Sequence, residues 1–318
     1  MSITVVGSVA YDTVATSFGR SERQLGGSAI YFSLAASKFT KTFPVGVYGN
    51  DFKQSDLELL ERNSIDISNL RKEDGLTFFW EGIYDNDDIN NRQTLATDLN
   101  VFENFLPILN KPAQNAEVVF LANINPELQF DVLEIAKNTN RHSFVGIDTM
   151  DLWINSAEKS LKKVIVKSDV IMIDQSEARL LSGENNLKNA GRKLMNLGAK
   201  YVVIKKGEHG VLIFTNDHEY ALPGYLTNNV KDPTGAGDSF AGSFFGFLDK
   251  CASYEHKDIF HASIFGTIIA SYTVENFGVK SLLLIDGEMI YKRYLDYMNL
   301  IGYKYIYSEN KFKDYLNI

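Results

Sequence analysis

Short β-rich runs alternate with amphipathic helical patterns along most of this chain. Between these runs, apolar residues recur at helical spacing, as in Pro126 to Lys137 and Leu187 to Leu197. Strands separated by helices predict an α/β protein with a mainly parallel sheet. The predicted strands are Ile3 to Val6, Phe43 to Val47, Val118 to Ala122, Phe144 to Asp148, Val170 to Ile173 and Tyr201 to Lys205.

One region departs from this alternation. Two strand-like runs, Leu76 to Tyr84 and Asn91 to Leu99, are joined by the polar residues 85–90 with no helix between them. This pattern predicts a β-hairpin. Together with the strand-like Thr13 to Phe18, the hairpin could form a small sheet that projects from the α/β core. Such a sheet either covers a site or is an ordinary edge hairpin.

Composition and charge exclude several classes of protein. The 318 residues are 45% hydrophobic, enough for a large globular core. Cys251 is the only cysteine, so we expect no internal disulfide and no zinc cluster, and a cytoplasmic location fits best. We expect neither a signal peptide nor a membrane segment, because the chain starts without a basic, apolar leader and its apolar stretches are short. A formal charge of -8 argues against a nucleic-acid partner.

The sharpest motif is a glycine-rich run, Lys231 to Gly242, that leads into a predicted helix. Gly235 and Gly237 permit a close backbone approach that a Cβ would block, so amides can converge on an anion at the helix N-terminus. The GxxxxGK[ST] spacing of another nucleotide-binding loop is absent. Asp238 stands within this anion hole. It is either a general base for a hydroxyl that attacks a phosphate or a helix-capping residue.

Several motifs together resemble one family. The run Asp232 to Phe240 resembles the C-terminal signature of the ribokinase-like kinases, also called PfkB carbohydrate kinases. Gly7 to Asp12 resembles their first strand and substrate-binding aspartate, and Gly26 to Ala29 resembles their paired-glycine substrate motif. Val45 to Asp51 is similar to the glycine-aspartate turn that follows. The resemblance therefore spans nearly the whole chain.

The resemblance implies a ribokinase-like, three-layer α/β/α core with a small β-sheet lid. The core would comprise residues 1–11, 26–74 and 100–318, and the lid residues 12–25 and 75–99. The implied activity is transfer of the γ-phosphoryl group of ATP to a hydroxyl of a small sugar or nucleoside, with Mg²⁺ as cofactor. A monovalent cation is a further candidate ligand, and a homodimer through the lid is a candidate assembly.

The resemblance also implies roles for individual residues. Asp238 would be the catalytic base, and Gly235, Ala236 and Gly237 would form the anion hole. The implied substrate-binding residues are Asp12, Gly26, Gly27, Asn50 and, on the lid, Arg92. The implied nucleotide-binding residues are Lys206, Gly207, Gly210, Thr234 and Asn276. Glu177 would organise Mg²⁺ through water. Asp174 stands where the family usually has asparagine, so its carboxylate either binds magnesium or lies in solvent.

The acceptor is less constrained by the sequence. Gly26 to Phe32 lacks the lysine and asparagine pattern of ribokinase proper and looks more like nucleoside-kinase members, which favours a ribonucleoside such as adenosine over ribose or fructose. Some aromatic residues could stack a base or belong to the core, namely Tyr31, Phe32, Phe78, Phe79 and Trp80. The alternatives are a free-sugar kinase and a catalytically silent nucleotide- or sugar-binding regulator on the same fold. A dehydrogenase is disfavoured because Gly7 to Ala10 does not form a GxGxxG turn.

Overall fold

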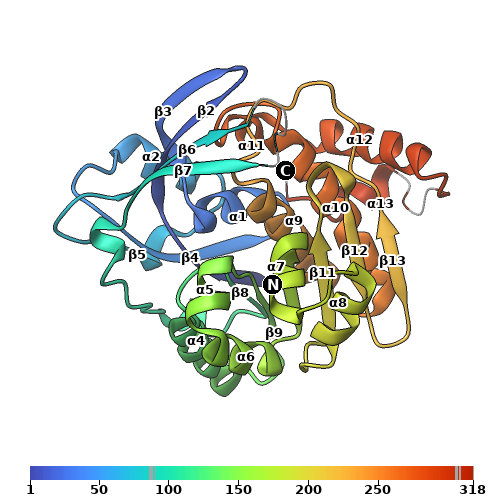
Figure 1. The fold of residues 1–318 in the computed structure, drawn as a ribbon. Helices are drawn as coiled ribbons and strands as arrows, with labels where there is room; N and C mark the ends of the chain where they lie inside the picture. Colours follow the sequence, from blue (N-terminus) through green and yellow to red (C-terminus); the bar gives the residue numbers. More distant parts are fainter. Residues whose placement is uncertain (86–88, 90, 305–306, 308, 318) are drawn as a thin grey trace.

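A computed structural model of the chain describes residues 1–85, 89, 91–304, 307 and 309–317. In this part of the chain, a nine-stranded sheet crosses the core in the order β13-β12-β11-β10-β9-β8-β1-β4-β5 (Figure 1). Its strands are β1 (Ser2–Val6), β4 (Lys41–Tyr48), β5 (Leu70–Lys72), β8 (Val118–Leu121), β9 (Phe144–Ile147), β10 (Val170–Asp174), β11 (Tyr201–Lys205), β12 (Val211–Phe214) and β13 (Glu219–Leu222).

The sheet is parallel from β5 to β11, as the alternation of strands and helices predicts. β1 lies between β4 and β8, with Val6 paired to both Val45 and Leu121. At the other end, β12 and β13 are antiparallel to their neighbours. The run Lys205 to Gly210 resembles a strand-turn-strand of the family, which agrees with β11, the turn and β12, whereas β13 was not predicted. The antiparallel direction of β12 follows from the short link between β11 and β12. Only the single 3-10 turn η3 (Gly207–His209) joins β11 to β12, and so short a link permits only an antiparallel pair.

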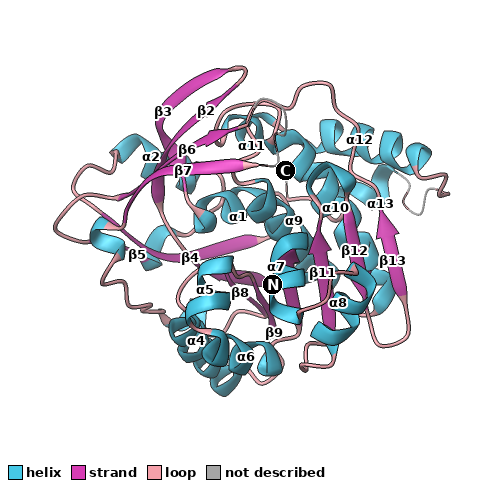
Figure 2. Ribbon diagram, viewed as in Figure 1, coloured by secondary structure: helices cyan, strands magenta, loops and turns pink. Residues whose placement is uncertain are grey.

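Helices cover both faces of this sheet (Figure 2). Along β10, Val170 and Met172 pack in one core, and Ile171 and Ile173 in the other, because successive strand residues point to opposite faces. The first core also contains residues of α1 (Ser28–Ala36), α2 (Gln54–Arg62), α9 (Ala236–Cys251), α10 (His256–Thr273), α11 (Lys280–Leu284), α12 (Gly287–Leu300) and α13 (Glu309–Lys313). The second contains residues of α3 (Lys111–Gln114), α4 (Pro126–Thr139), α5 (Asp151–Ser156), α6 (Glu158–Lys167), α7 (Gln175–Ser182) and α8 (Leu187–Met195).

Close packing of α1 against α9 brings two helix N-termini together. A Cβ at Gly242 would collide with the backbone of Phe32, and one at Gly246 would crowd Phe39. The helices therefore run side by side in the same direction, and the α9 N-terminus lies near that of α1. Within the described residues, no helix is long and apolar enough to cross a lipid bilayer.

A second, four-stranded sheet stands beside the core, at the upper left of Figure 1. Its order is β3-β2-β6-β7, formed by β2 (Ala10–Thr16), β3 (Gly19–Gly26), β6 (Phe78–Tyr84) and β7 (Arg92–Asp98). The predicted hairpin is therefore present as β6 and β7, although most of its turn, 85–90, lies outside the described residues. The strand β3 was not predicted, because its sequence, GRSERQLG, is too polar to show the usual strand pattern.

Candidate active site

The glycine-rich run forms an anion loop, residues 232–238, at the start of α9. Gly235 is the N-cap with φ of 76°, a left-handed conformation that favours glycine, and no side chain caps the helix. Asp238 therefore does not act as the cap. Among the described residues, the amides of Gly235, Gly237 and Asp238 have no hydrogen-bond acceptor. Free amides at a helix N-terminus are suited to bind a phosphate.

Asp238 lies in the first turn of α9, beside these amides. Burial and the nearby carboxylate of Asp148 raise the pKa of Asp238 to about 7, although Lys205 and Arg92 act in the opposite direction. A carboxylate with a pKa near neutrality is well matched to accept a proton during a reaction at neutral pH.

A largely buried lysine lies beside the anion loop, at the end of β11. The Nζ of Lys205 lies 3.0 Å from Oδ2 of Asp148, which follows β9. It also lies 3.2 Å from the point that a Cβ on Gly237 would occupy. Burial acts to lower the pKa of Lys205, but Asp148, Glu177 and Asp238 together raise it above its ordinary value. The anion loop therefore has a permanent ammonium group beside it.

Sequence reasoning singled out Lys206 and missed both Lys205 and Asp148. The backbone N–H of Lys206 donates to the carbonyl of Gly210, which closes the turn after β11. Adjacent residues at a strand end point in opposite directions, so the sequence could not say which lysine faces the site. The sequence did contain one signal, because Lys205 and Asp148 each end a predicted strand. Ligands of open α/β sheets bind outside the carboxyl ends of the strands.

Asp12 defines a second polar centre, on the lid strand β2. Its side chain is buried, and burial and Asp232 raise its pKa to about 7, opposed by a hydrogen bond from the backbone of Gly27. Gly27 caps α1 with φ of 95°. A Cβ at Gly26 would occupy the position of the Asp12 carboxylate. The structure thus brings together Asp12 and both glycines of the predicted substrate motif.

Asp232, at the start of the anion loop, is fully buried and was not among the predicted site residues. It accepts hydrogen bonds from the backbone N–H of Thr234 at 2.9 Å, from Nε2 of Gln24 at 3.2 Å and from the backbone N–H of Gly278 at 3.1 Å. The Thr234 hydroxyl shares a 3.1 Å hydrogen bond with the hydroxyl of Tyr84 on β6. Thr234, predicted to contact the nucleotide, therefore connects the loop to the lid.

The predicted lid residue Arg92 lies within reach of both centres. Its guanidinium stands 5.5 Å from the Trp80 ring, and its charge lowers the pKa values of Asp12 and Asp238, against the larger effect of burial. Asn50, in contrast, has an exposed side chain, and its backbone N–H donates to the carbonyl of Gly75 at the base of the lid.

Two of the aromatic residues considered for base stacking belong to the core. Tyr31 and Phe32 are fully buried on α1, and the Phe32 ring stacks on Phe120 with centroids 4.7 Å apart. Neither ring is free to stack a base. The Tyr31 hydroxyl is nevertheless close enough to Asp232, Asp12 and Asp238 that their charges raise its pKa further, in addition to the larger effect of burial. It has no hydrogen-bond partner among the described residues.

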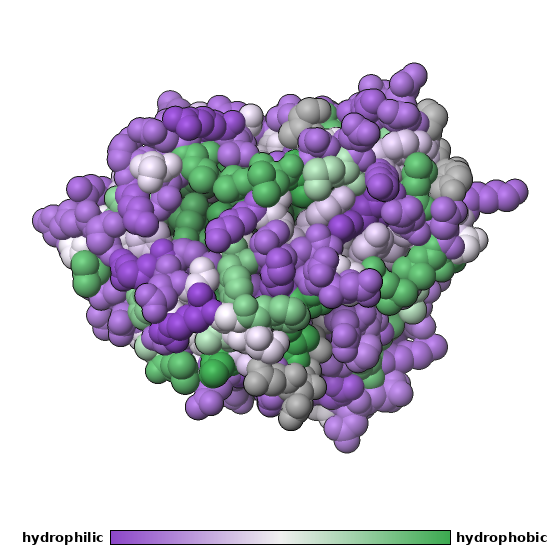
Figure 3. All heavy atoms as spheres, turned by 90° about the horizontal axis from the view of Figure 1, so that it is seen from above, coloured by the Kyte–Doolittle hydropathy of each residue, from purple (hydrophilic) through white to green (hydrophobic). Residues whose placement is uncertain are grey.

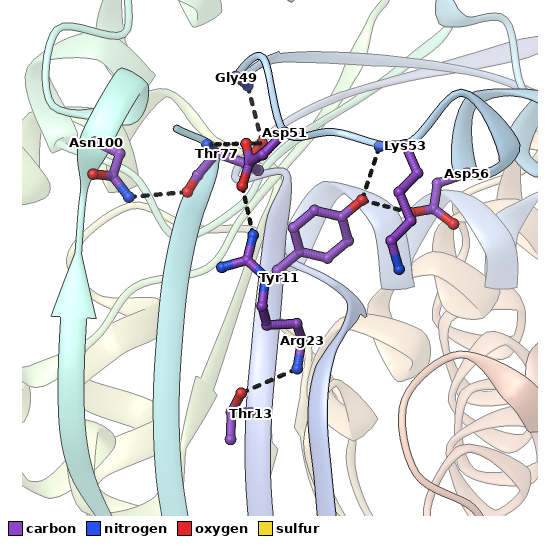
Figure 4. Close-up of polar contacts among 9 residues, drawn as sticks. All are labelled: Tyr11, Thr13, Arg23, Gly49, Asp51, Lys53, Asp56, Thr77 and Asn100. Atoms are coloured by element: carbon purple, nitrogen blue, oxygen red, sulfur yellow. Dashed lines mark hydrogen bonds and ion pairs between the residues drawn. The ribbon is translucent and has the colours of Figure 1, made fainter. Parts of the chain in front are cut away.

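A polar network connects the lid to the core (Figure 4). Oδ1 of Asp51 accepts hydrogen bonds from the backbone N–H and the hydroxyl of Thr77, each at 2.7 Å. Oδ2 of Asp51 pairs with Arg23 of β3, whose guanidinium lies 5.1 Å from the Tyr11 ring. The Tyr11 hydroxyl donates to Asp56 at 2.7 Å. Asp51 therefore holds both hairpins of the lid at one point of the core.

A cavity of about 180 Å³, which we call the α10 cavity, opens beside the anion loop. It is bounded by the loop 224–230, the C-terminal half of α10, and the residues around η3. Its lining includes Lys205, Gly207, Gly210, Ala236 and Gly237, together with Val211, Phe240, Ala270 and Val274. Lys206, Thr234 and Asn276 do not line it, and the Asn276 side chain instead donates to the hydroxyl of Ser281 at 3.0 Å. On the face of the molecule seen from above, apolar side chains form a band with polar side chains on either side (Figure 3).

The predicted metal residues lie at the start of α7. Asp174 caps this helix by accepting from the backbone N–H groups of Ser176 and Glu177, and Oε2 of Glu177 accepts from the backbone N–H of Asp174 at 2.9 Å. Burial, Asp148 and Asp174 raise the pKa of Glu177 to about 8. The extra carboxylate of Asp174 is thus occupied in a capping box, and it adds negative charge beside Glu177.

The chain is similar to known proteins over most of its length. A family model described as pfkB family carbohydrate kinase matches residues 2–285. The cytidine kinase of Thermococcus kodakarensis is 28% identical over 250 residues, which are 77% of this chain and 87% of that protein. The Burkholderia thailandensis nucleoside kinase in complex with inosine has a TM-score of 0.76 at 16% identity, over 95% of this chain and 99% of that one.

A third protein, from E. coli and described as a ribokinase II in complex with ATP and Mg²⁺, has a TM-score of 0.73 at 16% identity, over 92% of this chain and 98% of that one. The two solved structures establish the fold, including the three-layer core that the resemblance implied. The family model establishes more, because it matches almost the entire chain. The chain therefore belongs to the pfkB family of carbohydrate kinases, ATP-using enzymes that phosphorylate hydroxyl groups of sugars or nucleosides.

Proposed function

We propose that this kinase transfers the γ-phosphoryl group of ATP to a hydroxyl of a ribonucleoside, with adenosine-like compounds as the preferred acceptors. One observation carries the proposal. Asp238, a carboxylate with a pKa near 7, lies in a loop of free amides between the Asp12 centre and the α10 cavity. This is the arrangement that joins an acceptor site to a donor site across a proton-accepting group.

The chain's own residues supply three functions. Asp12, with the Gly27 amide beside it, binds hydroxyls of the acceptor. Asp238 accepts the proton of the attacking hydroxyl, which makes that oxygen a better nucleophile. The amides of Gly235 and Gly237 and the ammonium group of Lys205 stabilise the negative charge that spreads over the transferred group.

The carboxylates at the start of α7 fit a magnesium ion held through water. The ammonium group of Lys205 lies near Asp148 and Glu177. Repulsion from Asp148 and Asp174 contributes to the raised pKa of Glu177. In the described part of the chain, no three side chains are placed to ligate a metal directly. Mg²⁺ usually keeps several waters and takes only one or two carboxylates. When bound with ATP, it would neutralise charge on the phosphates.

The acceptor assignment rests on the lid and on relatives. Trp80, with Arg92 over its ring, lies on the lid strand whose residue Tyr84 bonds the anion loop. An aromatic face at this place supports a base-bearing acceptor. The cytidine and nucleoside kinases among the relatives support the same class. A ribokinase is also among them, so a free-sugar acceptor is the second candidate.

A panel of acceptors with Mg²⁺ and ATP tests the proposal. Adenosine, cytidine, inosine, ribose and fructose would be compared by kcat/KM, with ADP release and phosphorylated product both quantified. We expect nucleosides to exceed free sugars by at least tenfold. A free sugar as the best acceptor would refute the nucleoside preference and leave the kinase intact. ATP binding without turnover on any acceptor would instead favour a silent regulator.

Other expectations stay predictions. They are the cytoplasmic location, the division into core and lid units, activation by a monovalent cation, and a homodimer through the lid. Cell fractionation, turnover in potassium against tetramethylammonium salts, and light scattering would test the location, the cation and the assembly, respectively.

A further inference from the structure

Helix α12 (Gly287–Leu300) begins just beyond the residues that match the family model, yet one of its side chains reaches the α10 cavity region. The Arg293 side chain is only 14% exposed. Its guanidinium carbon lies 3.3 Å from the centre of the Tyr272 ring and 4.7 Å from that of Tyr225. A guanidinium placed over two tyrosine faces is held by cation–π attraction.

The polar contacts of Arg293 connect the two walls of the α10 cavity. One wall is the loop 224–230, which contributes Tyr225 and Thr227, and the other is the end of α10, which contributes Ser271. Arg293 stacks on Tyr225 and donates to the Ser271 hydroxyl at 3.0 Å, so it contacts both walls.

Glu275 completes the connection. Its Oε1 pairs with Nη2 of Arg293 at 3.0 Å and accepts from the Thr227 hydroxyl at 2.8 Å. The Arg293–Glu275 pair is largely shielded from solvent, so it is stronger than an ordinary surface pair. Without Arg293, Glu275 would lose the cation that pairs with it, and Tyr225 would lose the guanidinium over its ring. Of these contacts, only the hydrogen bond from Thr227 to Glu275 would then join the two walls.

The end of α10 is also connected to the anion loop. The carbonyl of Val274 accepts hydrogen bonds from the backbone N–H groups of Lys231 at 2.7 Å and Asp232 at 3.2 Å. Val274 lines the α10 cavity, one residue before Glu275. A shift of this wall would therefore alter the fit of a base and the position of the loop that binds its phosphates.

We propose that Arg293 is a positioning residue for the nucleotide donor, which holds the two walls of the α10 cavity at the spacing of a flat base. The inference rests on the proposed function, in which the α10 cavity binds the base of ATP. Arg293 does not line the cavity, and it acts through Tyr225, Ser271 and Glu275.

The test is calorimetric titration of ATP into the full-length protein without acceptor, for wild type, Arg293→Ala and Arg293→Lys. Lys292→Ala, at the exposed neighbouring position of α12, is the matched control. We expect Arg293→Ala to raise the Kd for ATP about tenfold, the size of effect that a shielded cation–π and ion-pair contact supports. Arg293→Lys should be intermediate, because lysine keeps the charge but not the planar stack. Lys292→Ala should bind as wild type.

The kinetic signature should be equally selective. The KM for ATP should rise in Arg293→Ala while the KM for the acceptor stays within about twofold. An unchanged Kd for ATP in Arg293→Ala, or an equal rise in both KM values, would overturn the proposal. If Arg293→Ala fails to fold, the Arg293→Lys titration decides by the same criterion. A wild-type protein that binds ATP but phosphorylates no acceptor would refute the proposed function and leave the role of Arg293 testable. The titration of ATP into the Arg293 variants needs no turnover.

Discussion

Replacing Asp238 with asparagine should abolish most turnover and, at the same time, stabilise the protein. Asparagine has nearly the size of aspartate but cannot accept the proton, so kcat should fall by roughly 10²- to 10⁴-fold. The folded protein raises the pKa of this carboxyl from 3.8 to about 7, with burial as the largest cause. At pH 8 the ionised side chain therefore costs the folded state at most about 4 kcal/mol, which the neutral amide would remove.

The stability gain should depend on pH in a defined direction. Because the folded pKa lies above the unfolded one, the cost of Asp238 is absent below about pH 4, grows between pH 4 and 7, and is complete above pH 7. Thermal unfolding of wild type and Asp238→Asn at pH 5 and pH 8 should show a larger difference at pH 8. The wild-type kcat/KM should fall below pH 7 and approach a loss of about tenfold per pH unit well below the pKa, since the base must be ionised.

Ser239→Ala is the matched control for these measurements. Ser239 is the next residue of α9 and is fully buried, and its hydroxyl has no partner among the described residues. Its removal should therefore leave turnover close to that of wild type. Near-normal turnover in Asp238→Asn would refute the assignment of the base. A loss of turnover accompanied by a lower melting temperature at pH 8 would show that Asp238 has a structural role instead.

Three further substitutions test the rest of the site. Gly237→Val places a side chain against Lys205 and the free amides, so turnover should fall at least about 100-fold with every acceptor, and a loss confined to one acceptor would move the loop to the acceptor pocket. Lys205→Met leaves Asp148 without its cation and should lower kcat by roughly 10²- to 10³-fold, whereas a change in acceptor KM alone would contradict a role at the phosphoryl group. Asp12→Ala should weaken acceptor binding roughly 10- to 100-fold, as expected for a charge-assisted hydrogen bond, and a comparable loss of ATP affinity by calorimetry would show the assignment to be wrong.

Local sequence determined the anion loop and the positions of the main strands along the chain. The glycines, Pro233 and Asp238 are contiguous, so their backbone preferences and the helix start that follows can be read without knowledge of the fold. The buried strands are short apolar runs between helical patterns, which likewise require only nearby residues. The paired-glycine motif and Asp12 came from resemblance, because neither signals its chemistry alone.

Only the tertiary structure decided which charges surround Asp238. Lys205 comes from β11 and Asp148 from the end of β9, and nothing in their local sequences distinguishes them from neighbours such as Lys206. The pKa values near 7 of Asp12 and Asp238 arise from burial and from carboxylates distant in sequence. The same holds for Arg293, which meets Tyr225 and Glu275 only because α12 packs beside α10. Local preferences act over a few residues, whereas burial and charge depend on which segments the fold brings into contact.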